Sequence, residues 1–249
     1  MKWFYIDTGF NTGKYNMDFD MSLAQSCTND IAFFRIYRWQ PYCISLGANQ
    51  KISDIKSEKA ASENIDIVTR PTGGRAILHA QEITYSVIYP FGKNFSPKEL
   101  YCEISKALLE GLILYDPLLE AAELETVQPN FPALLKESAG AVCFGSTAKN
   151  EVKFHGKKLI GSAQRKLNST ILQHGSILCG DYHKHLIDYL YIDENQFQHL
   201  KNEIDSKTIE IESIVRYETD YSKLIESLKT GFENHFEILE LINSFIKYK

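Results

Sequence analysis

The sequence predicts an α+β fold in which a mixed, mostly antiparallel β-sheet is flanked by helices. Short aromatic and β-branched stretches alternate with amphipathic helical stretches, but they do not follow the regular strand–helix–strand order of a parallel sheet. Glycines divide residues 138–179 into short apolar runs, which indicates strands joined by turns. We expect a single domain over residues 1–249, with a core over about residues 1–180 and a helical segment over about residues 181–249.

The first quarter of the chain contains three candidate strands and two candidate helices. We place the strands at residues 3–6, 32–39 and 42–46 and the helices at residues 15–26 and 55–63. The second and third strands are rich in aromatic and β-branched residues, and Gln40-Pro41 between them indicates a hairpin.

Later helices have clear start signals. Ser96 is a candidate N-cap, Pro97 suits the first helical position, and Glu99 completes a capping box. Apolar residues then recur at helical spacing as far as Tyr115, which predicts one buried face. Further helices are expected at residues 186–192, 197–204 and, after an Asp220 cap, 221–236.

The chain is arranged around the stretch Val68–Pro90, which is typical of a strand, a glycine loop and a second strand. Gly73 and Gly74 lack a Cβ atom, so this loop can adopt positive φ and let a ligand approach its backbone. Arg70 and Arg75 flank the glycines with planar cationic donors that suit carboxyl, phosphate or carbonyl oxygens. The alternative is a tight β-hairpin turn whose arginines are solvated.

Composition argues against several classes of protein. The net charge of −5 and the pI of about 5.8 disfavour a nucleic-acid-binding protein that uses a broad basic face. The cysteines are odd in number and have no paired spacing, so we expect reduced thiols in a cytoplasmic protein. We expect no secretory signal and no membrane-spanning helix, because no apolar stretch approaches the roughly 18 residues that such a helix needs.

Cys143 and Lys158 are the candidate catalytic residues. Cys143 lies among small residues that can leave its sulfur accessible. Downstream, His155-Gly156 predicts a hairpin turn that places Lys157 and Lys158 on opposite faces of the returning strand. A lysine on the inner face can lower the pKa of a thiol or orient a thioester carbonyl. The alternative is that the cysteine is a small buried apolar residue and the lysines form a solvated turn.

His79 and His174 are candidate site residues with a purely structural alternative, because either can be a hydrogen-bonded polar group of the core. No combination of His, Cys and acidic residues has the spacing of zinc ligands. The sequence also has no Gly-x-x-x-x-Gly-Lys-Ser/Thr phosphate-binding loop. We therefore expect no metal in the site.

Taken together, these stretches resemble the biotin/lipoate protein ligase superfamily. The matching segments, in family order, are Phe4–Phe10 with Asn16–Asp18, Arg70–His79 with Thr84–Ser86, Gly156–Gln164, and Gln173–Leu178. Each match alone is weak, but as a set they extend from residue 4 to about residue 180 and are specific. The resemblance implies that superfamily's catalytic-domain fold and a substrate-binding surface at Arg70, Gly73, Gly74, Arg75, His79, Tyr85, Gly161, Ser162, Ala163 and His174.

Within the superfamily, three features resemble the cysteine-dependent octanoyltransferase branch. Arg75 stands where ATP-dependent lipoate ligases typically have a third glycine, and Cys143 lies where this branch has its acyl-accepting cysteine. The chain after residue 181 is too short for the accessory domain of the longer ligases. One departure is Ala80, because many relatives have Asp after the histidine. If that carboxylate orients His79, another group must do so here.

The resemblance implies an acyl transfer that requires no ATP, metal or other cofactor. Cys143 would accept an octanoyl group from acyl carrier protein. A lysine of a lipoyl domain of a 2-oxoacid dehydrogenase, or of the glycine-cleavage H protein, would then receive it. Lys158 would orient the carbonyl and stabilise developing negative charge. We expect a monomeric acyltransferase of lipoate biosynthesis, with no nucleic-acid or membrane partner and with a local basic patch near its site.

Three alternatives remain open at this point. The first is an ATP-dependent lipoate–protein ligase that uses the same glycine loop. The second is an amidotransferase that moves octanoyl or lipoyl groups between acceptor domains. The third is a non-catalytic subunit that binds an acyl group or a partner protein.

Overall fold

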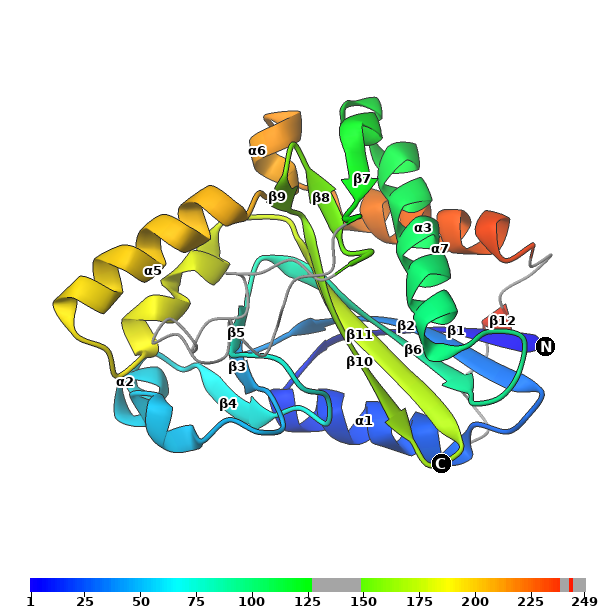
Figure 1. The fold of residues 1–249 in the computed structure, drawn as a ribbon, viewed down its shortest axis with the longest axis horizontal. Helices are drawn as coiled ribbons and strands as arrows, with labels where there is room; N and C mark the ends of the chain where they lie inside the picture. The colour runs from blue at the N-terminus through cyan, green and yellow to red at the C-terminus, as the bar shows by residue number, and fades with distance from the viewer. Residues whose placement is uncertain (127–148, 238–241, 244–249) are drawn as a thin grey trace.

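A six-stranded mixed sheet forms the centre of the molecule, with the strand order β10-β11-β6-β2-β1-β12 (Figure 1). The computed structural model describes residues 1–126, 149–237 and 242–243. Strands β10, β11, β6 and β2 pair antiparallel, whereas β1 pairs parallel with both β2 and β12. This confirms the predicted α+β fold. The strand bounds are β1 Lys2–Asn11, β2 Ile31–Trp39, β6 Glu82–Pro90, β10 Ile160–Leu167, β11 Thr170–Leu178 and β12 Ile242–Asn243.

Strand β6 is buried along its whole length, and its two faces differ in chemistry. Side chains alternate between the faces of a strand. The odd-numbered residues from Ile83 to Tyr89 belong to the main apolar cluster of the protein. The even-numbered residues Glu82, Thr84 and Ser86 are polar and buried on the opposite face. One face of β6 therefore builds the core, and the other carries polar groups into the interior.

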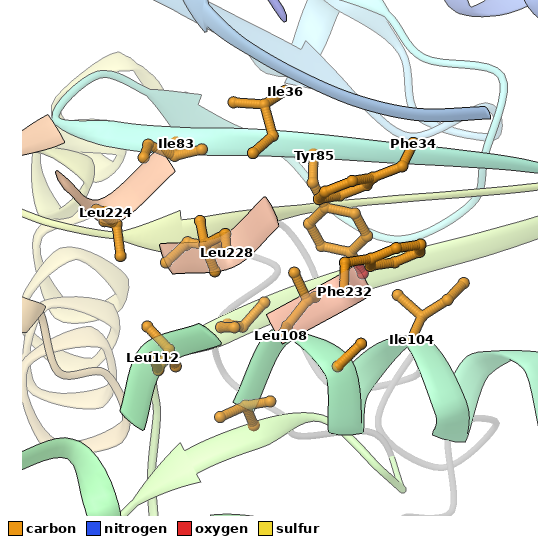
Figure 2. Packing of buried hydrophobic residues seen from close by; sticks show 14 of the residues in the cluster. Phe34, Ile36, Ile83, Tyr85, Ile104, Leu108, Leu112, Leu224, Leu228 and Phe232 are labelled. Carbon is orange, nitrogen blue, oxygen red and sulfur yellow. The ribbon is translucent and has the colours of Figure 1, made fainter. Parts of the chain in front are cut away.

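Helices α3 (Pro97–Tyr115) and α7 (Tyr221–His235) cover the apolar face of the sheet (Figures 1 and 2). The predicted capping box at Ser96 is confirmed, since its side chain accepts a hydrogen bond from the Glu99 backbone. The Phe232 ring of α7 stacks on Phe34 of β2 with 4.1 Å between ring centroids. The two helices approach closely at two glycines, because a Cβ atom on Gly231 would lie 2.3 Å from the Gly111 nitrogen.

Helix α1 (Gly13–Ser26) lies across the opposite face of the sheet (Figure 1). Thr12 caps it by accepting a hydrogen bond from the Tyr15 backbone. Leu23 at its C-terminal end packs in a small apolar cluster with sheet residues. Asp20, near its middle, is fully buried and contacts polar side chains of the sheet. This helix therefore supplies both apolar packing and a buried carboxylate.

A second, three-stranded sheet has the order β4-β3-β5. Its strands are β3 Cys43–Leu46, β4 Asp66–Thr69 and β5 Ile77–His79, and η1 (Ile52–Asp54) and α2 (Ser57–Ser62) connect β3 to β4. The predicted hairpin at Gln40-Pro41 is wrong, because β2 and β3 belong to different sheets and these residues carry the chain from one to the other. The hairpin alternative for the glycine loop is wrong too, since β4 and β5 flank β3 instead of pairing with each other.

A third, small sheet contains the predicted lysine turn. Its strands are β7 Ala122–Leu124, β8 Val152–Phe154 and β9 Lys157–Lys158. His155 and Gly156 both have positive φ and join β8 to β9, which pair antiparallel. Lys158 is buried and Lys157 is partly exposed, so the predicted separation of the two lysines is confirmed.

From β11 to the end of α7 the chain is helical, as predicted, whereas Ile242–Asn243 form strand β12 and not part of a helix. Its helices before α7 are the 3-10 helix η4 (Tyr182–Tyr189), α5 (Glu194–Lys207) and the short α6 (Ile211–Val215), and a further 3-10 helix, η2 (Pro117–Ala121), follows α3. Within residues 1–126, 149–237 and 242–243, none of the helices combines the length and the hydropathy of a membrane-spanning segment.

Candidate active site

A narrow cavity of about 30 Å³ lies where the glycine loop meets the polar face of the central sheet. Strands of both larger sheets line it, together with Met17 of α1. Several of the predicted site residues lie on its wall, namely Arg70, His79, Gly161, Ser162, Ala163 and His174. Segments that are far apart in the sequence thus meet at one place, which is the arrangement the resemblance implies.

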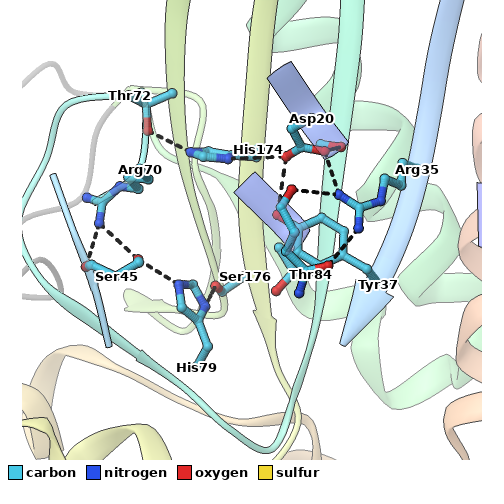
Figure 3. Close-up of polar contacts among 12 residues, drawn as sticks. Asp20, Arg35, Tyr37, Ser45, Arg70, Thr72, His79, Thr84, His174 and Ser176 are labelled. Carbon is cyan, nitrogen blue, oxygen red and sulfur yellow. Dashed lines mark hydrogen bonds and ion pairs between the residues drawn. The ribbon is translucent and has the colours of Figure 1, made fainter. Parts of the chain in front are cut away.

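Arg70 holds the glycine loop in place through hydrogen bonds, most of them to main-chain carbonyl oxygens. One terminal nitrogen donates to the Ser45 carbonyl and hydroxyl oxygens, at 2.8 and 3.1 Å (Figure 3). The other donates to the carbonyl oxygens of Gly73 and Arg75, at 3.0 and 2.7 Å. Because Arg70 is buried and bonded in this way, it braces the loop and also lines the cavity.

The two glycines of the loop differ in backbone conformation and in the space around them. Gly74 has a φ of +97°, in the left-handed region that favours glycine, as the sequence predicts for this loop. Its carbonyl oxygen lies so close to Gly47 that a Cβ atom on Gly47 would be 2.0 Å from it. A Cβ atom on Gly73 would meet only open space. Gly73, Gly74 and Arg75 shape the loop but do not line the cavity.

Both ring nitrogens of His79 have a polar side chain within hydrogen-bond distance. Its Nε2 lies 2.7 Å from the Ser45 hydroxyl (Figure 3). Its Nδ1 lies 2.8 Å from Glu82 Oε1. The imidazole also stacks on the indole of Trp39, with 4.1 Å between ring centroids. Glu82 therefore provides the carboxylate that Ala80 lacks, from two residues further along the chain.

Glu82 is fully buried, and its surroundings nevertheless favour the ionised carboxylate. Burial opposes ionisation, but His79 and hydrogen bonds from Thr84 and Ser176 outweigh it, so the pKa of Glu82 is lowered. Thr84 and Ser176 donate to its Oε1 at 2.5 and 2.8 Å. Thr84 in turn accepts a hydrogen bond from the Trp39 indole at 2.7 Å. The wall of the cavity behind His79 is thus a connected polar network.

A second buried carboxylate, Asp20, lies behind His174. It accepts a hydrogen bond from Arg35 at 2.7 Å (Figure 3) and another from Ser86, also at 2.7 Å. The His174 Nδ1 lies 3.8 Å from its second oxygen. Burial opposes its ionisation, but Arg35 and His174 outweigh burial, so the pKa of Asp20 is lowered. Arg35 and Asp20 are both fully buried, which makes them a structural ion pair beneath the cavity.

His174 connects this carboxylate to the glycine loop. Its Nε2 lies 2.6 Å from the hydroxyl of Thr72, which precedes the loop glycines (Figure 3). Burial lowers the pKa of His174, although the neighbouring Asp20 acts in the opposite direction. A neutral imidazole with two polar neighbours suits a rigid wall. It also agrees with the structural alternative of a satisfied core histidine.

Lys158 lies beside the cavity and not on its wall. Its ammonium is 3.0 Å from Glu151 Oε2, and both side chains are almost completely buried. The other oxygen of Glu151 accepts a hydrogen bond from the backbone nitrogen of Ser162, at 3.1 Å. The Ser162 hydroxyl in turn lies 2.7 Å from the Tyr85 hydroxyl. One carboxylate thus links the predicted catalytic lysine to a strand that lines the cavity.

Cys143 lies outside the residues that the structure describes, so its predicted role stays a prediction. The described cysteines are poor candidates for a nucleophile. Burial raises the pKa of the Cys27 thiol to about 11 and also raises the pKa of Cys43 and Cys179, which disfavours the reactive thiolate. None of the described cysteines lines the cavity.

The sequence reasoning missed the residues that support the site from behind. These are Asp20, Arg35, Trp39, Ser45, Thr72, Glu82, Glu151 and Ser176. The sequence pattern could have indicated Glu82, because polar residues occupy every second position at the start of its strand, at Glu82, Thr84 and Ser86. For most of the others, the partners come from distant segments, whereas Glu151 meets Lys158 across the turn at His155-Gly156. In the part of the chain that the structure describes, no three His, Cys, Asp or Glu side chains are grouped to hold a metal.

Comparison with known proteins places the chain in a family of lipoyl protein ligases. A family model described as the lipoyl protein ligase A/B catalytic domain matches residues 12–233. Octanoyltransferase LipM of Macrococcus caseolyticus is 32% identical over 244 residues, which cover 95% of this chain and 88% of that protein. Octanoyltransferase LipM of Bacillus subtilis is 32% identical over 96% of this chain and 89% of its own length.

Solved structures show the same fold at lower sequence identity. A bipartite lipoate protein ligase from Thermoplasma acidophilum, studied with its E2 lipoyl domain, superposes with a TM-score of 0.76 at 17% identity. That match covers 99% of this chain and 88% of the other. A lipoate-protein ligase A bound with ATP gives a TM-score of 0.75 at 15% identity, with 99% and 90% of the two chains covered.

Proposed function

Because the chain belongs to the lipoyl protein ligase A/B catalytic domain family, we propose that it is an octanoyltransferase of lipoate biosynthesis. The observation that carries this proposal is the similarity to proteins named octanoyltransferase, 32% identical over nearly the whole length of both chains. The cavity supports it, because six of the ten predicted substrate-binding residues, from three distant segments, line it.

The first step of the proposed reaction transfers the acyl group to the enzyme. The Cys143 thiolate attacks the thioester carbonyl of octanoyl-acyl carrier protein. A new carbon–sulfur bond forms to Cys143, the bond to the carrier sulfur breaks, and the carrier leaves as a thiolate that takes up the proton Cys143 lost to solvent when it ionised. In this proposal the acyl group is held against the cavity wall, which Arg70, His79 and Gly161 line.

The second step moves the octanoyl group to an amine. The ε-amine of an acceptor lysine attacks the acyl-enzyme, an amide bond forms, and the Cys143 thiol is released. Lys158 has the role of orienting the carbonyl and stabilising the negative charge that develops on its oxygen. Glu151 supports this role, since it holds the Lys158 ammonium at a fixed place near Ser162. Thioester-to-amide transfer is downhill, so the reaction needs no ATP.

The proposed partners are both proteins. Acyl carrier protein is the donor, and a lipoyl domain or the glycine-cleavage H protein is the acceptor. One structural relative was studied together with its E2 lipoyl domain, which supports an acceptor of this kind. We also propose that the enzyme is a cytoplasmic monomer of one catalytic domain. The free thiols of the described cysteines fit a reducing compartment.

An assay that follows the acceptor protein separates this function from its rivals. Purified enzyme is mixed with octanoyl-acyl carrier protein and an apo lipoyl domain, without ATP, and the mass of the acceptor is recorded. We expect one octanoyl group per acceptor. If the acceptor is modified only when ATP and free lipoate are supplied, the chain is an ATP-dependent ligase. If only an octanoylated acceptor domain serves as donor, it is an amidotransferase.

A further inference from the structure

The cavity of the candidate active site is too small for the acyl group that the proposed function assigns to it. Its volume of about 30 Å³ holds about one or two water molecules. A cavity of about 150 Å³ admits benzene, which has six carbon atoms, so an eight-carbon chain requires still more space. A side chain on the cavity wall must therefore move when an octanoyl group enters.

The side chains that line the cavity differ in their freedom to move. Hydrogen bonds hold the large polar and aromatic ones, namely Tyr37, Trp39, Arg70, His79 and His174. Among the described lining residues, Met17 and Ile77 are the two other apolar side chains larger than alanine. Ile77 is β-branched, which restricts its χ1. Met17 is unbranched and has rotatable bonds that let it adapt to irregular space, so it is the lining side chain best able to move.

The backbone of helix α1 is fixed on both sides of Met17 by Arg35. This guanidinium donates to Asn16 Oδ1 at 2.6 Å and to Asp20 Oδ1 at 2.7 Å. The Asn16 amide in turn donates to the Arg38 carbonyl oxygen at 3.2 Å. Arg35, Asn16 and Asp20 are all fully buried. The helix therefore stays in place, and the Met17 side chain itself must make room for a ligand.

Met17 lies at the end of the cavity that is far from the proposed reacting group. The lining residues of the central sheet extend from β10 through β11 and β6 to β2, three strand spacings or about 14 Å. The carbon–carbon bonds of an octanoyl chain span at most about 11 Å. Glu151 links Lys158 to Ser162 of β10, whereas Met17 packs in one apolar cluster with Tyr37 of β2. A chain whose carbonyl lies beside Lys158 thus ends near Met17.

We propose that Met17 sets the length of the acyl chain by closing the inner end of the cavity. The thioether swings aside far enough to admit eight carbons and blocks further methylenes. The identity of this chain as the octanoyl group of the transfer reaction rests on the proposed function, whereas binding of a fatty acid beside Met17 does not. Met17→Ala removes the Cγ, Sδ and Cε atoms and makes room for a longer chain. Met17→Phe fills the same end with a larger, rigid ring.

Binding is tested by NMR without any turnover. Trp39 lines the cavity, whereas Trp3, the other tryptophan, packs in the apolar core against Phe232. Protein labelled with ¹⁵N at tryptophan is titrated with sodium hexanoate, octanoate and decanoate, each below its micelle concentration. For the wild type, we expect saturable shifts of the Trp39 indole signal and the tightest binding for octanoate. In Met17→Ala the affinity rises by about fourfold per methylene as far as decanoate, because each further methylene is buried. In Met17→Phe hexanoate binds most tightly.

Met21→Ala is the matched control, because Met21 is a partly buried methionine one turn further along α1 that does not line the cavity. We expect it to keep the wild-type order of affinities. Opposite shifts in Met17→Ala and Met17→Phe separate a length limit from a general loss of packing, which would weaken the binding of every acid. The inference is overturned if a folded Met17 variant keeps the wild-type order. It is overturned without any variant if octanoate does not shift the Trp39 signal of the wild type, or if the wild-type affinity rises steadily from hexanoate to decanoate.

Activity then connects the length limit to the transfer reaction. The enzyme is given octanoyl- and decanoyl-acyl carrier protein in competition, and the masses of the modified lipoyl domain are recorded. We expect Met17→Ala to raise the ratio of decanoyl to octanoyl product about tenfold, and Met21→Ala to leave it unchanged. An unchanged ratio in an active Met17→Ala enzyme overturns the inference and leaves the proposed function standing. Failure of the proposed function differs, because the wild type then transfers neither chain while the fatty-acid titration still reports on Met17.

Discussion

At the scale of single residues, the site is defined by carboxylates that hold basic groups in place. Glu82 fixes His79, Asp20 lies behind His174, and Glu151 pairs with Lys158. Each carboxylate is almost completely buried. Buried carboxylates are tolerated when charges and hydrogen bonds compensate for the water they lose, and these three have such partners. In the proposed reaction, these carboxylates position His79, His174 and Lys158.

The Glu151–Lys158 pair gives a first prediction. Glu151→Gln keeps an acceptor for the Ser162 backbone but removes the charge beside Lys158. We expect acylation of Cys143 to slow by about tenfold to a hundredfold, because a misplaced cation stabilises the developing charge less well. The rate is measured by rapid quench and intact mass spectrometry. Glu125→Gln is the matched control, since it removes the carboxylate 3.2 Å from Lys153 in the same small sheet. Equal rates for wild type and Glu151→Gln would remove Glu151 from the mechanism.

His174 gives a prediction about stability and pH. Its pKa is lowered in the folded protein, chiefly by burial, below the value of about 6.5 for an unfolded chain. As pH falls below about 6.5, the unfolded chain binds a proton that the folded protein resists. The stability contribution is therefore present above this pH and is lost as pH falls toward the folded pKa. In urea titrations between pH 7 and pH 5, we expect His174→Gln to lose less stability than the wild type. Parallel losses would show that this imidazole is protonated as readily in the fold as outside it.

At the scale of elements, strand β6 connects the core to the site. Its odd-numbered residues pack under α3 and α7, and its even-numbered residues Glu82, Thr84 and Ser86 enter the two polar networks. A shift of register by one residue would exchange the faces and place the carboxylate in the apolar core. The packing of α3 and α7 on this strand therefore also maintains the geometry of the site.

The close contact of α3 and α7 gives an element-scale prediction. A Cβ atom on Gly231 would lie 2.3 Å from the Gly111 nitrogen and 2.6 Å from its Cα, and both are backbone atoms of a helix. Gly231→Ala must therefore separate the helices, which costs about 1–3 kcal/mol of unfolding free energy. Chemical denaturation measures this loss. Ser222→Ala, at an exposed position of the same helix, should be nearly neutral. A Gly231→Ala protein as stable as the wild type would mean that the helices lie further apart.

At the scale of the whole molecule, local patterns predicted most elements and part of the site. The capping box at Ser96 and the turn at His155-Gly156 were correct because each depends on neighbouring residues alone. The hairpin at Gln40-Pro41 was wrong because the partner of β3 is chosen by distant strands. Glu151 was missed for a different reason: it lies only seven positions before Lys158, but the predicted turn alone does not tell which side chains meet across it.

The residues that lie behind the cavity wall were harder to predict than those that line the cavity. The family resemblance supplied Arg70, His79 and His174, all of which line the cavity. Asp20 and Trp39 could not be found in this way, because their roles appear only when α1 and β2 are placed against the central sheet.

The most direct test of the proposed function is the mass of the enzyme itself. Wild-type protein and Cys143→Ala are each mixed with octanoyl-acyl carrier protein in the absence of ATP, and their intact masses are recorded. A thioester acyl-enzyme predicts a gain of one octanoyl group that hydroxylamine removes and that Cys143→Ala does not show. A wild-type protein that stays unmodified while it still transfers octanoyl groups, or a Cys143→Ala protein that gains the same mass, would contradict the account.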